Sequence, residues 1–196
     1  MILEEFKHHC IHNKPDIVVQ KFLIEESSYF FNEIIKGEEY DFKREIATIL
    51  EVHIRDIAIV GSGKLGFSLK PNSGATNLYQ FKSFDAGGID KKSDLDIAII
   101  SSYLFDKEIE NLYKHMGFYK TKWEDRVSFA KYVLKGRLAI RFLPESFPLT
   151  KGILKVQEKY KMQYGRVVNI EIYKSWYYFE TYHQENIKNI QVNLIA

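Results

Sequence analysis

The spacing of apolar residues changes near residue 56, and this change separates a helical first part of the chain from a remainder that contains a sheet. Within residues 16–35 and again within residues 42–50, apolar side chains recur three or four positions apart, as on one face of an amphipathic helix. Residues 56–60 and 94–100 are instead short apolar runs, which are typical of strands buried in a sheet. We therefore predict helices first and two core strands after them.

The segment between the two predicted strands has a third pattern. Residues 67–70 and 77–81 each alternate apolar and polar side chains, and the turn-forming residues 71–74 lie between them. Alternation predicts strands, and a cluster of Pro, Asn, Ser and Gly predicts a tight connection. We therefore expect a β-hairpin-like insertion between the first predicted strand and the second.

The rest of the chain predicts further helices and strands around the same sheet. Helical spacing marks residues 107–116, 124–134 and 151–164 and a last helix after Ser175, whereas strands fit residues 138–143 and 167–173. This order of elements predicts an α/β (α+β) fold, in which helices flank a mixed β-sheet.

Size and composition fit one globular domain. Hydrophobic residues make up 45% of the 196 residues and charged residues 28%, which leaves enough apolar surface to build a core. We expect a single domain over residues 1–196, made of N-terminal helices (1–55), a core (56–101), and helices and strands (102–196). The net charge of +2 is too small to indicate a nucleic-acid-binding surface by itself.

The compartment follows from the same sequence features. Cys10 is the only cysteine, so no disulfide forms within the chain, which is typical of a reducing compartment. The first residues lack a basic end followed by an apolar run, and no apolar stretch approaches the roughly 20 residues that a membrane span needs. We expect a soluble cytoplasmic protein without a membrane partner.

Two carboxylates at the start of the second core strand carry the strongest chemical signal. Asp94 and Asp96 are two positions apart, and in a strand such residues point to the same face. Two like charges this close repel each other unless a cation compensates them. Mg²⁺ prefers oxygen ligands and is commonly shared between one or two carboxylates and substrate phosphates. We therefore predict that the pair binds Mg²⁺, with Mn²⁺ as the alternative ion.

A glycine and a serine directly after the first core strand carry the second signal. Gly61 permits a tight turn and a close approach of the backbone to a phosphate, and the Ser62 hydroxyl can bind phosphate oxygens. Lys64 and Lys70 follow closely and are weaker candidates for the same nucleotide-binding site. Together with a metal at the Asp pair, these residues suit in-line attack on the α-phosphorus of a nucleotide.

These residues resemble a known family. Gly61-Ser62-x-x-x-Gly66, followed by Ser93-Asp94-Leu95-Asp96-Ile97, is similar to the signature of the nucleotidyltransferase superfamily, which includes DNA polymerase β and the minimal nucleotidyltransferases. The resemblance implies an enzyme that transfers a nucleoside monophosphate from an NTP, with ATP the expected one, and releases pyrophosphate. It implies that Gly61 and Ser62 hold the phosphates and that Asp94 and Asp96 bind metal. The acceptor stays open among a small molecule, a protein and RNA.

The sequence departs from the family in two ways. The family usually places its Asp pair much closer to the Gly-Ser, whereas 31 residues, 63–93, intervene here. The family also usually has a third carboxylate on a later strand, and our candidate is Glu171. Without a third carboxylate, the alternative is a catalytically silent protein that binds a nucleotide, a nucleic acid or a partner on the same fold.

Other patterns have competing interpretations. Gly61-x-Gly63-x-x-Gly66 matches the glycines of a dinucleotide-binding Rossmann turn, which is a remote alternative. That turn needs a helix directly after it, and Pro71 with its cluster of turn-forming residues argues against such a helix. A structural zinc site usually takes ligands from separated pairs, so we interpret the N-terminal cluster as a surface feature; its members are His8, His9, Cys10 and His12. We likewise interpret a lysine stripe at helical spacing as a solvated face; its members are Lys151, Lys155 and Lys159.

Overall fold

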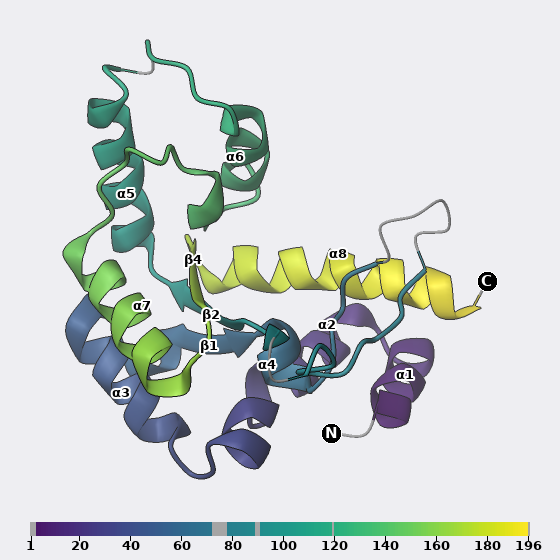
Figure 1. Ribbon diagram of the computed structural model, residues 1–196. Helices are drawn as coiled ribbons and strands as arrows, with labels where there is room; N and C mark the ends of the chain where they lie inside the picture. Colours follow the sequence, from purple (N-terminus) through teal and green to yellow (C-terminus); the bar gives the residue numbers. More distant parts are fainter. Residues whose placement is uncertain (1–2, 72–77, 89–90, 119, 196) are drawn as a thin grey trace.

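The centre of the molecule is a four-stranded mixed sheet, seen in a computed structural model that describes residues 3–71, 78–88, 91–118 and 120–195 (Figure 1). Its strands are β1 (Ile57–Val60), β2 (Leu95–Ile100), β3 (Arg137–Ala139) and β4 (Val168–Tyr173), in the spatial order β1-β2-β4-β3. The central pair, β2 and β4, is parallel, and both outer pairs are antiparallel. The predicted mixed sheet flanked by helices is confirmed.

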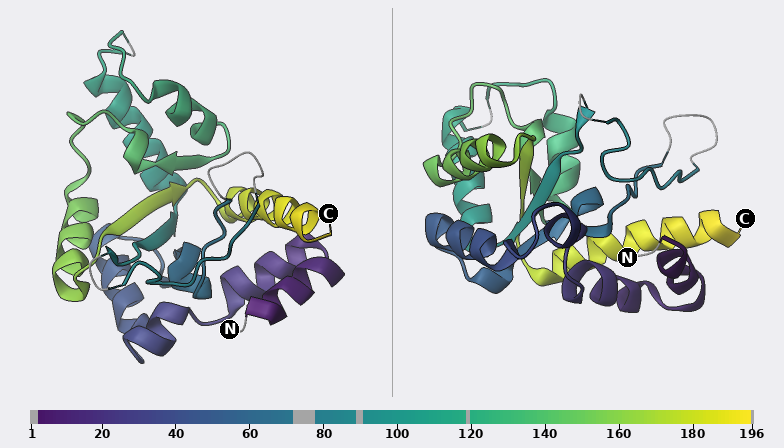
Figure 2. Two further views of the ribbon diagram at one scale, coloured as in Figure 1. Left: turned by 45° about the vertical axis from the view of Figure 1, so that its right-hand side comes forward. Right: turned by 60° about the horizontal axis from the view of Figure 1, so that its bottom comes forward.

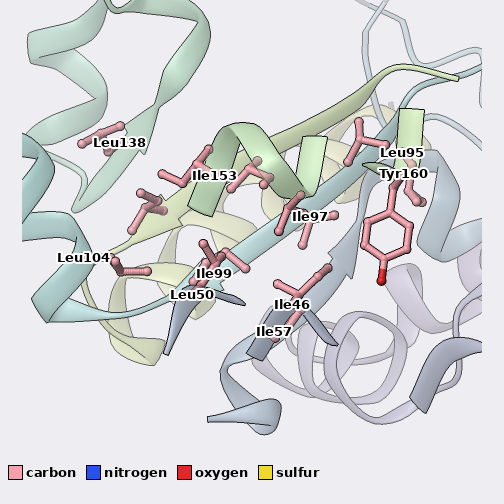
Figure 3. Close-up of a cluster of buried hydrophobic side chains, with 14 of the residues drawn as sticks. Ile46, Leu50, Ile57, Leu95, Ile97, Ile99, Leu104, Leu138, Ile153 and Tyr160 are labelled. Carbon is pink, nitrogen blue, oxygen red and sulfur yellow. The ribbon is translucent and has the colours of Figure 1, made fainter. Parts of the chain in front are cut away.

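One face of the sheet carries the main core. Alternate residues of the strands, such as Ile57, Ile97 and Ile99, point to this face and are almost fully buried. Two helices cover it: α3 (Glu39–Leu50), which contributes Ile46 and Leu50, and α7 (Lys151–Tyr164), which contributes Ile153 and Tyr160 (Figure 3). The helix α5 (Ser102–His115) closes the same core beside them.

The opposite face of the sheet is apolar at one end and polar at the other. Ala98, Ile100 and Tyr173 pack there against Phe179 of the long helix α8 (Trp176–Ile195). Figure 2 shows α8 beside the N-terminal helices α1 (Leu3–His12) and α2 (Pro15–Val18). Because residues two apart share a strand face, the polar residues at the start of β2 and β4 lie on this same face, beyond its apolar end.

The predicted helical segment at residues 16–35 is broken in the structure. It consists of α2, a π-helical segment η1 (Val19–Glu25) and a second one, η2 (Phe30–Ile34). The chain leaves the helical conformation at Glu26, and two groups from elsewhere bind the connection. The ammonium of Lys64 donates to the Glu26 carbonyl, and the Glu39 carboxylate accepts from Ser28. These tertiary contacts satisfy backbone groups that a helix would have paired internally.

The segment after β1 follows a hairpin-like path. A short helix, α4 (Gly61–Leu65), comes first, and the chain then runs out and back with antiparallel bridges between Phe67 and Ser83 and between Pro71 and Tyr79. The bridges are isolated ones, so the two predicted strands are not continuous. Residues 72–74 of the expected turn and residue 77 of the second predicted strand lie outside the described residues. The outgoing and returning parts bury Phe67 and Phe81 against the N-terminal helices.

The remaining elements follow the predicted order. The helices are α5, α6 (Arg126–Val133), α7 and α8, and the predicted strand at 138–143 is shorter than expected. It forms β3 and then a 3-10 turn, η5 (Ile140–Phe142), where the indole of Trp123 donates to the Phe142 carbonyl. Among the helices that the structure describes, none combines the length and apolar character needed to cross a membrane.

A buried arginine ties the returning end of the insertion to the start of β2. Arg166 donates from Nη1 and Nη2 to the two Asp85 oxygens, at 3.1 Å each, and from Nη1 to the Ser93 carbonyl at 2.7 Å. Asp85 and Ser93 also bind each other directly, through Ser93 N to Asp85 Oδ1 and Asp85 N to Ser93 Oγ. The guanidinium lies against the rings of Phe30 and Phe84. We call this group the Arg166 clasp.

We expect Arg166→Leu to lower the free energy of unfolding by about 3 kcal/mol, measured by urea denaturation. The Arg166 side chain is only 4% exposed and Asp85 28%, so the substitution takes the arginine donors away from a partly buried carboxylate and from the Ser93 carbonyl. The control is Arg44→Leu, because Arg44 and its partner Asp41 are both more than 60% exposed, and we expect a loss of about 1 kcal/mol or less. Similar losses of unfolding free energy in the two variants would show that the Arg166 clasp does not stabilise the fold.

We expect the protein to lose stability on acidification partly through His183. Its Nε2 is buried without a partner among the described residues, and burial, helped by the charge of Arg137, lowers the pKa of His183 to about 3. Below about pH 6.5 this histidine is therefore protonated in the unfolded chain but stays neutral in the folded protein. The free energy of unfolding falls as the pH drops through this range. Between pH 7 and pH 5 the histidine should cost about 1–2 kcal/mol. Urea denaturation at both pH values should show a smaller loss in His183→Phe; an unchanged loss would exclude His183 as its source.

Candidate functional site

The structure brings the Gly-Ser and the Asp pair together at one end of the sheet. Gly61 and Ser62 begin α4 immediately after β1, Asp96 lies on β2, and Asp94 immediately precedes that strand. Because β1 and β2 are antiparallel neighbours with Val60 opposite Asp96, the end of one strand meets the start of the other. The intervening insertion therefore leaves the two strands adjacent.

Gly61 is required at its position for two reasons. Its φ is +63°, a left-handed conformation that costs most residues about 1–2 kcal/mol. In addition, a Cβ at Gly61 would lie 2.7 Å from Oδ2 of Asp96, closer than such atoms approach each other. The absence of a side chain thus lets the backbone directly after β1 pass beside the Asp96 carboxylate.

A cavity of about 700 Å³ lies in front of these residues, within the range that is usual for ligand sites. Ser62, Asp94 and Asp96 line it at the end of the sheet, and Ser68 and Ser83 line it from the insertion. Four lysines border it, two from the insertion and two from the segment that leads back to β2; they are Lys70, Lys82, Lys91 and Lys92. Cations outnumber carboxylates among the lining residues, so the cavity suits an anion that also brings a cation to the Asp pair.

Asn169 bridges the two carboxylates. It lies opposite Asp96 in the parallel register of β2 and β4, and its Nδ2 donates to Asp96 Oδ1 at 2.8 Å and to Asp94 Oδ2 at 3.2 Å. Burial raises the pKa of Asp96, and the nearby charge of Glu171 adds to this, whereas the amide of Asn169 and the charge of Lys70 oppose it. Asn169 was not predicted from the sequence, although alternation along the predicted strand at 167–173 places it on the same face as Glu171.

Glu171, the predicted third carboxylate, is engaged by two arginines. It lies on the same face of β4 as Asn169, two residues further along the strand. Its Oε2 accepts from Arg137, and its Oε1 accepts from Arg141 at 3.2 Å. It is largely buried and is not among the lining residues of the cavity. The structure thus places it near Asp96 but ties its carboxylate to these cations.

Lys64, the predicted nucleotide-binding lysine, points away from Ser62. It is 3% exposed, and its ammonium donates to the Glu26 carbonyl beside a separate small cavity lined by Tyr29 and Asn32. Burial lowers the pKa of Lys64 to about 8. The structure therefore gives Lys64 a structural contact with the N-terminal helices, and Lys70, the other early candidate, is the lysine that borders the cavity.

The Asp pair fits a divalent cation only if a ligand supplies further oxygens. Within the described residues, no group of three or more His, Cys, Asp or Glu side chains could hold a metal ion. The rings of His8 and His12 lie 4.3 Å apart on α1, but in the described part of the chain they belong to no group of three such side chains. Two carboxylates on one side of a cavity remain the arrangement in which Mg²⁺ shares ligands with substrate phosphates.

Comparison of the chain with protein-family models, with curated proteins and with solved structures gave no significant match. The assignment of function therefore depends on the geometry of the cavity and on the chemistry of its lining residues.

We expect Gly61→Ala to lower the free energy of unfolding more than Gly37→Ala. Both glycines have positive φ, so both variants should lose about 1–2 kcal/mol from backbone strain. A Cβ at Gly37 meets nothing within 4 Å, whereas at Gly61 it meets Asp96, so Gly61→Ala should lose about 1–3 kcal/mol more. Urea denaturation measures both changes. Equal losses would show that the close approach of Gly61 to Asp96 carries no energetic weight.

Proposed function

We propose that this protein is a Mg²⁺-dependent nucleotidyltransferase, which transfers a nucleoside monophosphate from an NTP to an acceptor and releases pyrophosphate. One observation supports this most: Ser62, Asp94 and Asp96 line a single cavity that is bordered by lysines. A triphosphate is a polyanion that arrives with a divalent cation, and this cavity offers cationic and carboxylate groups side by side. The expected nucleotide is ATP.

Each group has a role in this proposal. The four lysines attract the triphosphate, and the Ser62 hydroxyl donates to a phosphate oxygen. Asp94 and Asp96 would hold Mg²⁺, which when bound stabilises the charge that develops on the phosphate oxygens. An acceptor oxygen attacks the α-phosphorus, the bond to the bridging oxygen of the pyrophosphate breaks, and the acceptor proton passes to a carboxylate of the Asp pair. Glu171 is engaged by two arginines and does not line the cavity, so the Asp pair supplies the carboxylates that are available as this base.

A second candidate function is nucleotide binding without turnover. It is favoured by Asn169, which lies opposite Asp96 where a carboxylate would complete a three-acid site, and by the ion pairs of Glu171. A two-carboxylate site holds a second metal ion poorly. The two candidates share ligand binding and differ only in release of pyrophosphate.

We expect Mg-ATP to raise the melting temperature by roughly 5–10 °C at a hundredfold excess over its Kd. Asp94→Asn and Asp96→Asn should remove most of this shift, because each takes away one carboxylate from the metal. The matched control is Asp125→Asn, an exposed aspartate at the start of α6 that makes no capping hydrogen bond, and it should keep the full shift.

Pyrophosphate release then separates the two candidates. It should be measured with each NTP and with small-molecule, protein and RNA acceptors, including the protein itself. Release that is lost in Asp96→Asn supports nucleotidyl transfer, and a thermal shift without release under all these conditions supports silent binding. Absence of any shift with Mg-NTP would contradict both.

A further inference from the structure

We propose that Asn169 makes metal binding at the Asp pair depend on the nucleotide, so that the free protein binds Mg²⁺ weakly and takes it up together with the triphosphate. This inference rests on the proposed function, because it concerns the same cavity. It adds that the metal ion and the nucleotide bind together, and it assigns this dependence to the side chain of Asn169.

The position of Asn169 is the first step. The parallel register of β2 and β4 sets it directly opposite Asp96, and its amide donates to both aspartates, at 2.8 and 3.2 Å. A carboxylate at this position would add a third negative charge. The amide adds none, and its donor holds the two like-charged groups together while no cation is between them.

The second step is that no neighbouring acid replaces the missing charge. Glu171 is the next side chain on the same face of β4, and Arg137 and Arg141 share its carboxylate. Two cations for one anion leave this part of the face with no net negative charge to offer a metal ion. The metal therefore finds only Asp94 and Asp96, two ligands of the six that Mg²⁺ requires.

The third step is independent of the acids. Four lysines border the same cavity, against two carboxylates, and they repel a free divalent cation; they are Lys70, Lys82, Lys91 and Lys92. They attract a complex of the ion with a triphosphate, which is negatively charged overall. The phosphates neutralise the lysines and supply further oxygen ligands to the ion. The charge of the cavity thus favours the complex over its separate parts.

The test is Mn²⁺ binding to the protein, with and without α,β-methylene-ATP, which the site cannot cleave at the α-phosphorus. Binding is followed by the loss of the free-ion signal in electron paramagnetic resonance, after subtraction of the Mn²⁺ that the analogue alone binds in a protein-free titration. For the unmodified protein we expect the analogue to strengthen Mn²⁺ binding at least about fivefold. For Asn169→Asp we expect Mn²⁺ alone to bind about tenfold more tightly, with a smaller effect of the analogue. The control, Asn189→Asp, adds the same charge on an exposed part of α8 and should behave like the unmodified protein.

A second variant tests the charge argument without touching Asn169. Lys70→Gln removes a cation whose charge acts on Asp96, so Mn²⁺ alone should bind more tightly and the analogue less tightly. This variant also decides the matter if Asn169→Asp does not fold, as shown by circular dichroism.

Three results would overturn the inference: Mn²⁺ binding that is equally tight with and without the analogue, no gain in a folded Asn169→Asp over Asn189→Asp, and no gain in Lys70→Gln. Calorimetry measures binding of the analogue separately. If the analogue still binds when one of these results is found, this inference fails and the proposed function survives. If the analogue binds neither with nor without Mn²⁺, the proposed function fails, and this inference fails with it.

Discussion

The bidentate ion pair between Arg166 and Asp85 decides where the insertion rejoins the sheet. Asp85 binds Ser93, which directly precedes Asp94. Arg166, which binds Asp85, lies two residues before the start of β4. At the other end of the insertion, Phe84 N donates to the Gly66 carbonyl at 2.7 Å. The outgoing and returning chains are therefore fastened at their base. Because these contacts hold the two ends of the insertion together, its length does not disturb the pairing of β1 with β2.

The same fastening makes the site composite. The carboxylates come from the sheet, whose register is set by the apolar residues on its other face, and the four lysines come from the insertion and its return. A shift of the insertion would move the lysines relative to the aspartates without unfolding the core. The clasp thus fixes the distance between two groups of opposite charge that no strand pairing connects.

The sequence predicted those parts of the site that depend on short-range rules. Alternation along a strand placed Asp94 and Asp96 on one face, the apolar spacing gave α7 its observed bounds, and Gly61 fell where a side chain does not fit. Spacing did not place Lys64 correctly. Because α4 is helical, a residue two positions after Ser62 lies about 200° around the helix axis, away from the cavity that Ser62 lines. Its burial against the Glu26 carbonyl is a long-range contact that spacing does not encode.

Asn169 and Glu171 show where sequence reasoning stops. Both lie on one face of β4, so alternation alone treats them alike, and charge favoured the glutamate. The register with β2 puts the neutral amide beside Asp96 instead, and β3 brings Arg137 to the glutamate. Further along this face Tyr173 packs under α8, whereas Asp96 lines the cavity and Asn169 binds Asp96 through its amide. The partner strand therefore decides which polar side chain of β4 belongs to the site, and that choice separates a three-carboxylate site from a two-carboxylate site.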